Sequence, residues 1–211
     1  MIVIAEGING SGKTSLCEQL ERRTRWPVFR SFRRAGRNFN EIVEGMRQIG
    51  IPVNSYIEDV LVAEVLGQVG RNVILDRSLP SAIAYGSLYG EFDENDPRIK
   101  SWMDVWQESL LQGGGPVVYL YLGCCYEDSK KRCKHEKFPL EDEKDWWHVA
   151  TQLDRTCGMV NRIPKLSIDT SGYGPTVTLE VAKRFIDEHK RQNQGNVSKG
   201  REFPGWNCAH D

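Results

Sequence analysis

Short apolar runs alternate with longer segments of helical periodicity along most of the chain. The runs that predict buried strands are 2–6, 28–32, 72–76, 117–122 and 166–169. The segments that predict helices are 13–23, 40–49, 55–69, 79–89, 97–111, 127–136, 143–161 and 175–190. Continuous apolar strands separated by helices are typical of a parallel sheet that is covered on both faces. We therefore expect an α/β domain whose functional edge lies at the carboxyl ends of the strands.

Residues 7–14, between the first strand and the first helix, match the pattern G-x-x-x-x-G-K-S/T. In this strand–loop–helix setting the pattern predicts a phosphate-binding loop (P-loop), because the glycines let backbone N–H groups face the phosphates. Lys13 is expected to reach the terminal phosphates of ATP, and the Thr14 hydroxyl to ligate Mg²⁺. The residues predicted to bind this nucleotide are Gly7, Asn9, Gly10, Ser11, Gly12, Lys13, Thr14 and Ser15.

Together, the loop and the alternation predict an α/β P-loop NTPase fold: a five-stranded parallel sheet with helices on both faces and a small basic lid. Residues 1–190 are expected to form this domain, with the lid at about 130–144. The length of 211 residues suits one domain with a sizeable core. Residues 191–211 are polar with little periodicity, and they predict a flexible tail.

Composition and charge narrow the functional classes. The formal net charge of −1 argues against a dedicated nucleic-acid binder. No apolar run reaches transmembrane length, and the chain starts directly on the first strand without room for a signal peptide. We therefore expect a cytoplasmic protein without a membrane partner. The six cysteines include no C-x-x-C pair and predict free thiols; a zinc site is the alternative, formed by Cys124, Cys125, Cys133 and His135.

Asp76 and Arg77 follow the apolar run 72–76 at the expected active edge. An aspartate at this point of a P-loop protein supports Mg²⁺, often through water, and a helix N-cap is the alternative for Asp76. The Arg77 guanidinium suits bidentate binding of a phosphate, and an ion pair with a carboxylate is compatible with that role.

Two segments resemble thymidylate kinases. Residues 6–14 resemble the family pattern E-G-x-D/E-G-x-G-K-T, and residues 76–85 resemble D-R-Y/F-x-x-S-x-x-A-Y/F. The resemblance covers 1–16 and 73–90 well, and the remainder by architecture. It implies that the γ-phosphoryl group of ATP is transferred to a deoxynucleoside monophosphate, giving the diphosphate. It also implies a homodimer.

Carried over by position, the resemblance gives roles to further residues. Glu6 is expected at the acceptor side of the P-loop, and Arg77 near the acceptor phosphate. Ser81 and Tyr85 are expected to line the nucleotide pocket. The alternatives are N-capping or turn bonding for Ser81 and core packing for Tyr85.

In the family that the chain resembles, one group carries a catalytic arginine inside the P-loop and another carries it in the lid. Residues 8–11 here include no arginine, so the resemblance implies that the lid supplies the catalytic cation. Phosphoryl transfer is catalysed largely by positioning and by cations that stabilise the charge of the transition state. Arg132 is our first choice, with Lys131 and Lys134 behind it. The alternative is a solvated helix face on which these cations pair with nearby acidic residues, namely Glu127, Asp128 and Glu136.

A cluster of arginines follows the second predicted strand, and its members are Arg30, Arg33, Arg34 and Arg37. Arg30 and Arg33 are predicted to bind the acceptor phosphate, while the interleaved Phe29, Phe32 and Phe39 suit stacking on a base. The same residue types also suit contact with single-stranded nucleic acid. A third interpretation is a strand whose alternate residues face solvent.

The chain departs from the thymidylate kinase pattern at positions that read the acceptor. Asn9 replaces an acidic residue that helps to read the sugar hydroxyl, and it offers weaker hydrogen bonds than a carboxylate. Ser78 replaces an aromatic residue, and Gly86 a glutamine. The segment 55–69 lacks the arginine that faces thymine, and its Asp59 and Glu64 favour an amino-bearing base.

Two other functions fit the sequence. A deoxynucleoside kinase shares this fold but phosphorylates a neutral 5′-hydroxyl, which requires a general base. The Asp76-Arg77-Ser78 turn keeps that function open, whereas the arginines after the second strand suit an acceptor that already carries phosphate. The remaining alternative is an ATP-binding module without kinase activity.

Overall fold

The computed structural model describes residues 1–30, 72–90, 93–112, 115–133 and 142–197. Its centre is a five-stranded sheet in the order β2-β3-β1-β4-β5, and every strand pair is parallel. The strands are β1 (Ile2–Gly7), β2 (Val28–Arg30), β3 (Val73–Asp76), β4 (Val117–Gly123) and β5 (Lys165–Asp169). The predicted P-loop NTPase fold is confirmed by this parallel sheet and the helices around it.

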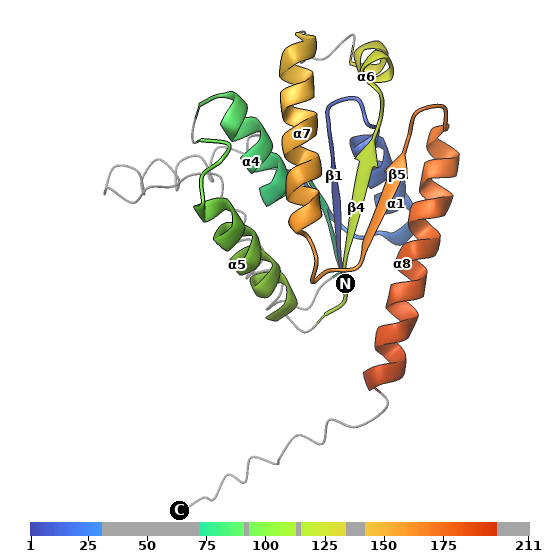
Figure 1. Cartoon of the computed structure of the whole chain (residues 1–211). Helices are drawn as coiled ribbons and strands as arrows, with labels where there is room; N and C mark the ends of the chain where they lie inside the picture. Colours follow the sequence, from blue (N-terminus) through green and yellow to red (C-terminus); the bar gives the residue numbers. More distant parts are fainter. Residues whose placement is uncertain (31–71, 91–92, 113–114, 134–141, 198–211) are drawn as a thin grey trace, which may run out of the picture.

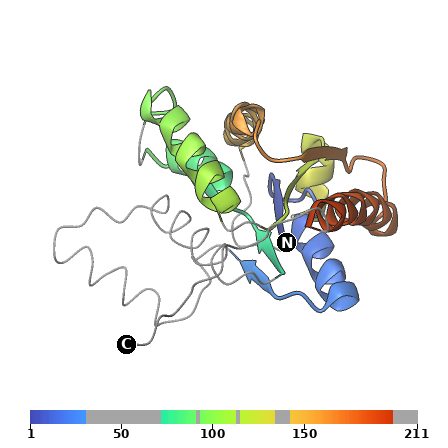
Figure 2. The same ribbon diagram turned by 90° about the horizontal axis from the view of Figure 1, so that it is seen from below.

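Helices cover both faces of the sheet (Figure 1). They are α1 (Lys13–Thr24), α4 (Leu79–Leu88), α5 (Arg98–Gln112), α6 (Tyr126–Arg132), α7 (Glu143–Met159) and α8 (Pro175–Val197). Helices α4, α5 and α7 pack on one face, and α1 and α8 on the other, which Figure 2 shows from below. Short α6 lies above the carboxyl end of β4, at the same edge as the start of α1.

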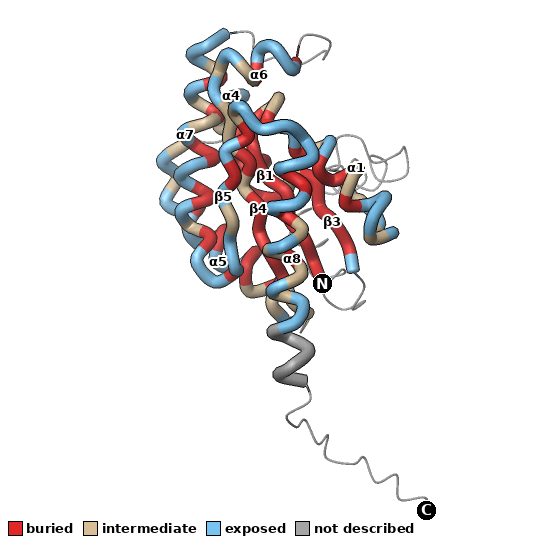
Figure 3. The backbone as a smooth tube through the Cα atoms, turned by 90° about the vertical axis from the view of Figure 1, so that its right-hand side faces the viewer, coloured by how far each residue is buried: buried red, intermediate tan, exposed pale blue. Residues whose placement is uncertain are grey.

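The alternation of side chains along β1 divides the core into two layers. Ile2 and Ile4 belong to the apolar cluster under α4, α5 and α7, whereas Val3 and Ala5 belong to the cluster under α1 and α8. Successive residues of a strand point to opposite faces, so a central strand must be apolar at every position. Figure 3 shows the buried strands enclosed between outer helix faces that are exposed.

Most predicted boundaries agree with the structure to within a few residues. The main difference is α8, which was expected to end at 190 and continues to Val197. Residues 191–196 contain no proline and include arginine and glutamine, which have good helix propensity, so a polar helix forms without an apolar stripe. The predicted helices 40–49 and 55–69, most of the lid and residues 198–211 lie outside the described residues.

Two simpler expectations concern cysteines and membranes. The described cysteines are free thiols, and they are Cys17, Cys124, Cys125, Cys133 and Cys157. Across the described ranges, no three metal-binding side chains of the His, Cys, Asp or Glu type gather at one point; His135 of the alternative zinc site falls outside those ranges. None of the described helices is both long enough and apolar enough to span a bilayer.

Strand register brings the sequence-predicted residues to one edge. Ala5 of β1 pairs with Asp76 of β3, which in turn pairs with Arg30 of β2. On the other side of β1, Gly7 pairs with Leu122 near the end of β4. The P-loop therefore leaves the central strand between the ends of β3 and β4, where the carboxyl ends of parallel strands form a ligand site.

Candidate active site

The P-loop adopts backbone conformations that its glycines permit. Gly7 and Gly10 have φ angles of 151° and 78°. A Cβ atom on Gly10 would lie 2.7 Å from the backbone of Ser129 in α6, and one on Gly7 would lie 2.2 Å from the carbonyl oxygen of Leu122. Both positions therefore need glycine for two reasons, the positive φ and the close approach of a neighbouring backbone.

The start of α1 forms an anion site. Gly12 is its N-cap and provides no side-chain hydrogen bond, and the first turn holds no acidic residue. The first N–H groups of a helix have no partner within the helix, and the helix dipole makes this end positive. The backbone N–H groups that follow Gly12 are thus suited to bind phosphate oxygens.

Asp76 and Thr14 form the predicted metal-binding pair. Thr14 Oγ1 donates a hydrogen bond to Asp76 Oδ2 at 2.9 Å. Asp76 Oδ1 is buried and has no hydrogen-bond partner among the described residues. A buried carboxylate oxygen without a donor suits a hard cation or its water ligands, so these two residues fit Mg²⁺. The alternative N-cap role for Asp76 is excluded, because the N-cap of α4 is Ser78.

Lys13 is buried at the end of the P-loop, with 7% of its surface exposed. Burial and, after it, the neighbouring Arg77 lower the pKa of its ammonium group to about 8, against the opposing effects of Asp76 and Glu6. Bound phosphate would restore the protonated form by supplying negative charge. Without ligand, the protonated form of Lys13 is therefore less stable than in water, and a bound anion would stabilise it.

Arg77 connects the P-loop to α4. Its Nη1 donates to Gly7 O at 3.2 Å and to Ser81 Oγ at 2.9 Å, and its Nη2 donates to Asn9 Oδ1 at 2.5 Å. Its guanidinium also lies 4.8 Å from the centre of the Tyr85 ring. The backbone of Arg77 has a φ of 78°, which is strained for a residue with a Cβ. Such strain is held in place by these contacts and aims the cation at the P-loop.

Glu6, which the resemblance placed at the acceptor side of the P-loop, is held by the start of α4. It is fully buried, and its carboxylate accepts hydrogen bonds from the backbone and hydroxyl of Ser78 and from the Ser81 hydroxyl. Burial raises the pKa of Glu6, while Arg77 and these donors oppose the increase. The Ser81 hydroxyl therefore binds Glu6 rather than capping α4. Tyr85 combines core packing with its contact to Arg77.

A pocket of about 460 Å³ opens along the P-loop. Lysine and arginine side chains line it together with the P-loop and the start of α8. Its lining residues are Asn9, Gly10, Ser11, Gly12, Lys13, Thr14, Ser15, Leu16, Gln19, Asp76, Arg77, Arg132, Thr170, Tyr173, Pro175 and Thr178. The buried Ser11 Oγ, like Asp76 Oδ1, has no hydrogen-bond partner among the described residues.

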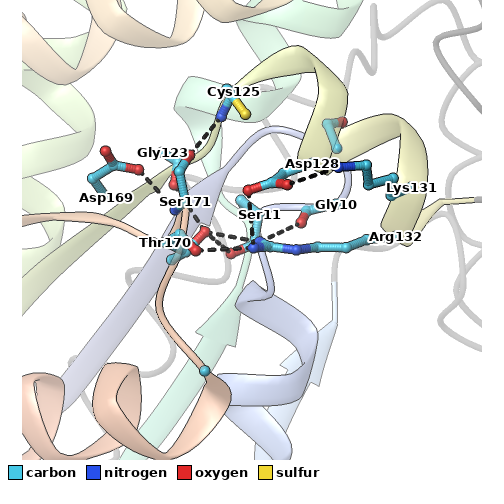
Figure 4. A network of polar contacts seen from close by, with 12 residues as sticks. Gly10, Ser11, Gly123, Cys125, Asp128, Lys131, Arg132, Asp169, Thr170 and Ser171 are labelled. Atoms are coloured by element: carbon cyan, nitrogen blue, oxygen red, sulfur yellow. Dashed lines mark hydrogen bonds and ion pairs between the residues drawn. The ribbon is translucent and has the colours of Figure 1, made fainter.

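Arg132, the expected lid cation, lies at the end of α6 and reaches this pocket. Its Nη1 donates to Gly10 O at 3.2 Å, and its Nη2 donates to Thr170 O at 2.9 Å (Figure 4). Asp128 lies 3.6 Å from the guanidinium, so the ion pair of the alternative interpretation is also present. Lys131 instead points to the outside and lies 3.9 Å from Asp128.

Other predicted residues lie wholly or partly outside the described part of the chain. The backbone of Arg30 ends β2 at the active edge, but its side chain is not described. Arg33, with the remainder of the arginine cluster, lies outside the described residues, as does Lys134. Sequence analysis also missed Ser129 and Thr170, whose hydroxyls contact the P-loop. For Thr170 the available signal was its position directly after β5, at the carboxyl edge of the sheet.

Solved structures of nucleoside and nucleotide kinases are similar to this fold. A deoxyadenosine kinase from M. mycoides with the products dCMP and dCDP is 13% identical, with a TM-score of 0.59 over 89% of this chain and 99% of its own. A thymidylate kinase from Candida albicans is 15% identical, with a TM-score of 0.56 over 91% of this chain and 92% of its own. This is a P-loop kinase fold.

A third similar structure with this kinase fold is the YorR protein of Bacillus subtilis in complex with phosphorylated GDP. It is 15% identical, with a TM-score of 0.52 over 91% of this chain and 98% of its own. No model of a known protein family matches the chain, and no curated protein does so either. At these identities the similarity establishes the kinase fold, and the argument for a reaction rests on the site.

Proposed function

We propose that this protein transfers the γ-phosphoryl group of ATP to a nucleoside monophosphate, giving the diphosphate, as thymidylate kinases do. The proposal rests on the pocket that joins the P-loop, the Thr14–Asp76 pair and the Arg77 guanidinium. Phosphoryl transfer needs little covalent help from protein groups, and it depends on holding two phosphates in line while neutralising their charge. The geometry supports both requirements.

The donor is ATP with Mg²⁺. The uncapped start of α1 and Lys13 bind its phosphates, and Thr14 with Asp76 holds the metal, which would neutralise charge on the phosphate oxygens. The part of the pocket that extends toward Gln19, Tyr173 and Thr178 has room for the nucleoside portion. Lys13 and the N–H groups at the start of α1 orient the triphosphate as it binds.

Charge on the acceptor side supports a phosphorylated acceptor. Lys13, Arg77 and Arg132 bring three cations to the pocket. The carboxylates nearest to Arg77 have other partners: Glu6 is buried against Ser78 and Ser81, and Asp76 accepts from Thr14 at the proposed metal site. Neither of these two is therefore well placed as a general base for a neutral hydroxyl, which a nucleoside kinase requires.

An assay of ADP release with nucleosides and nucleoside monophosphates tests the proposal. Turnover should require a monophosphate, and Lys13→Ala should abolish it. Nucleoside monophosphates with different bases distinguish thymidylate from a nucleotide with an amino-bearing base. The acceptor chemistry of Asp59 and Glu64 favours the amino-bearing base. Turnover of nucleosides without turnover of monophosphates would show that the protein is a deoxynucleoside kinase. ATP consumption that responds only to nucleic acid would indicate a module of another class.

The resemblance to thymidylate kinases also carries a proposal about assembly. We expect a homodimer in solution, which sedimentation velocity at micromolar concentration measures directly. A single species with the mass of one 24.1 kDa chain would contradict it.

A further inference from the structure

Side chains from outside the P-loop bind successive carbonyl oxygens of its backbone. Ser129 Oγ donates to Asn9 O at 2.6 Å, and Thr170 Oγ1 donates to Ser11 O at 3.0 Å. Between them, Arg132 Nη1 donates to Gly10 O at 3.2 Å. Figure 4 shows Arg132 and Thr170 converging on the loop from α6 and from the turn after β5. The carbonyl oxygens of the loop are thus bound by two separate segments, α6 and the turn after β5.

These bonds bear on phosphate binding through the geometry of the peptide unit. In a planar trans peptide, the C=O of one residue and the N–H of the next point in opposite directions. A donor that fixes Ser11 O therefore fixes the direction of the Gly12 N–H, and one that fixes Asn9 O fixes that of the Gly10 N–H. Preorganised N–H donors bind charge without the cost of reorientation on ligand binding.

Thr170 is held firmly enough to serve this purpose. Only 3% of its surface is exposed, and its backbone N–H donates to Gly123 O, at the end of β4, at 2.8 Å. Its hydroxyl proton faces both Ser11 O and Gly123 O, while its oxygen accepts from Arg132 Nη1 at 3.0 Å. The hydroxyl thereby connects the P-loop, the end of β4 and α6 through one buried atom.

We propose that Thr170 is a positioning residue for the triphosphate of the donor, acting through the Ser11 carbonyl, and that Ser129 has the same role at Asn9. The proposal rests on the proposed function only in taking ATP as the ligand. Thr170 contacts the backbone of the loop, so its effect on phosphate binding is indirect. The expected role of Arg132 as a catalytic cation remains a separate prediction.

A matched pair of variants isolates the hydroxyl. Thr170→Val keeps the shape of the side chain and removes the hydroxyl, whereas Thr170→Ser keeps the hydroxyl and loses a methyl group. Calorimetric titration with Mg·ATP and with tripolyphosphate should show binding about tenfold weaker for Thr170→Val, the effect of one lost hydrogen bond. The two ligands should lose the same factor, because the affected contacts are to phosphate. Thr170→Ser should bind within about twofold of the parent protein.

Thr156→Val is the control for a purely structural effect. Thr156 is also buried, and its hydroxyl donates to Gln152 O and Leu153 O within α7, away from the P-loop. It should lower the melting temperature to a similar extent as Thr170→Val without changing ATP affinity. If Thr170→Val lowers the melting temperature but binds both ligands as tightly as the parent, Thr170 is only structural and the inference is wrong.

The same measurements separate this inference from the proposed function. Titration requires no phosphoryl transfer. A parent protein that binds Mg·ATP but phosphorylates no monophosphate would refute the proposed function, and a weakened Thr170→Val would still support the positioning role. Conversely, normal turnover of monophosphates together with unaltered ATP binding by Thr170→Val would refute the positioning role alone.

Discussion

Thr14 and Asp76 stand 62 residues apart in the sequence, yet Thr14 Oγ1 donates to Asp76 Oδ2 at 2.9 Å. The register that pairs Ala5 with Asp76 creates this contact, since it sets the end of β3 beside the start of the P-loop. Asp76 Oδ1 is buried and has no hydrogen-bond partner among the described residues, and Asp76 lines the pocket. The pair thus joins loop and strand at the point where Mg²⁺ would bind.

Asp76→Asn should raise the Mg²⁺ concentration needed for half-maximal ADP release by about 10- to 100-fold, the usual effect of losing a group that orients metal ligands. An amide keeps an acceptor for Thr14 but removes the charge that attracts the cation. Titration of activity with Mg²⁺ at saturating ATP measures this shift. Asp154→Asn is the control, since the exposed Asp154 accepts from Tyr121 on the outside of α7 and does not line the pocket. An unchanged Mg²⁺ requirement in Asp76→Asn would exclude the metal role.

ATP binding should take up a proton above pH 8, because the pKa of buried Lys13 is about 8 without ligand and bound phosphate raises it. Affinity should therefore fall as pH rises from about 8, by up to tenfold per unit until the pKa of the complex is reached. Calorimetry in two buffers of different ionisation enthalpy measures the uptake. Lys13→Arg should bind ATP without it, since arginine does not titrate in this range. Uptake that persists in Lys13→Arg would assign the proton to another group.

Arg77→Lys should raise the KM for the acceptor about 10- to 100-fold and change the KM for ATP much less. A lysine keeps the charge but cannot reproduce the fork that contacts Gly7, Ser81 and Asn9 together. Steady-state kinetics with each substrate varied in turn separates the two constants. Arg155→Lys, which alters an exposed arginine bound to Glu94 O, is the control. Equal increases in both KM values would mean that Arg77 supports the loop alone.

Tyr119→Phe should stabilise the protein by about 1 kcal/mol, because a buried hydroxyl without a partner costs free energy that phenylalanine avoids. Tyr119 is fully buried, and its OH has no hydrogen-bond partner within the described ranges. Its edge contact with Trp106 would remain. Urea unfolding measures the change. Tyr121→Phe, two residues along β4, should give no gain, because the Tyr121 hydroxyl donates to Asp154 at 2.6 Å.

Periodicity and the P-loop motif were sufficient to predict the sheet and the described helices. The apolar runs are specific because a central parallel strand such as β1 must be buried on both faces. The motif placed Thr14 at the carboxyl edge of the sheet, and the apolar run 72–76, which ends in a carboxylate, placed Asp76 at the same edge. These predictions depended on local sequence and on the common edge of parallel strands.

The contacts of individual side chains could not be predicted from periodicity or from the motif. Glu6 was predicted to lie at the acceptor side, but its hydrogen bonds with Ser78 and Ser81 were not predicted, because they depend on the packing of α4 against the end of β1. Thr170 contacts Ser11 across 159 residues, and nothing in the residues around it distinguishes this hydroxyl from others at strand ends. The length of α8 was underestimated because a polar helix without an apolar stripe has no periodic signal.

The uncapped start of α1 makes the stability of the protein depend on bound nucleotide. Gly12 offers no side chain to the first N–H groups of the helix, so a bound triphosphate completes hydrogen bonding that the polypeptide leaves open. Because the ligand binds only the folded helix start, the free energy of ligand binding adds to the free energy of unfolding. At a nucleotide concentration 100 times its Kd, the native state would gain about 2.7 kcal/mol. The abundance of such a protein would follow the nucleotide pool of its surroundings, because molecules without nucleotide would unfold more often and be degraded first.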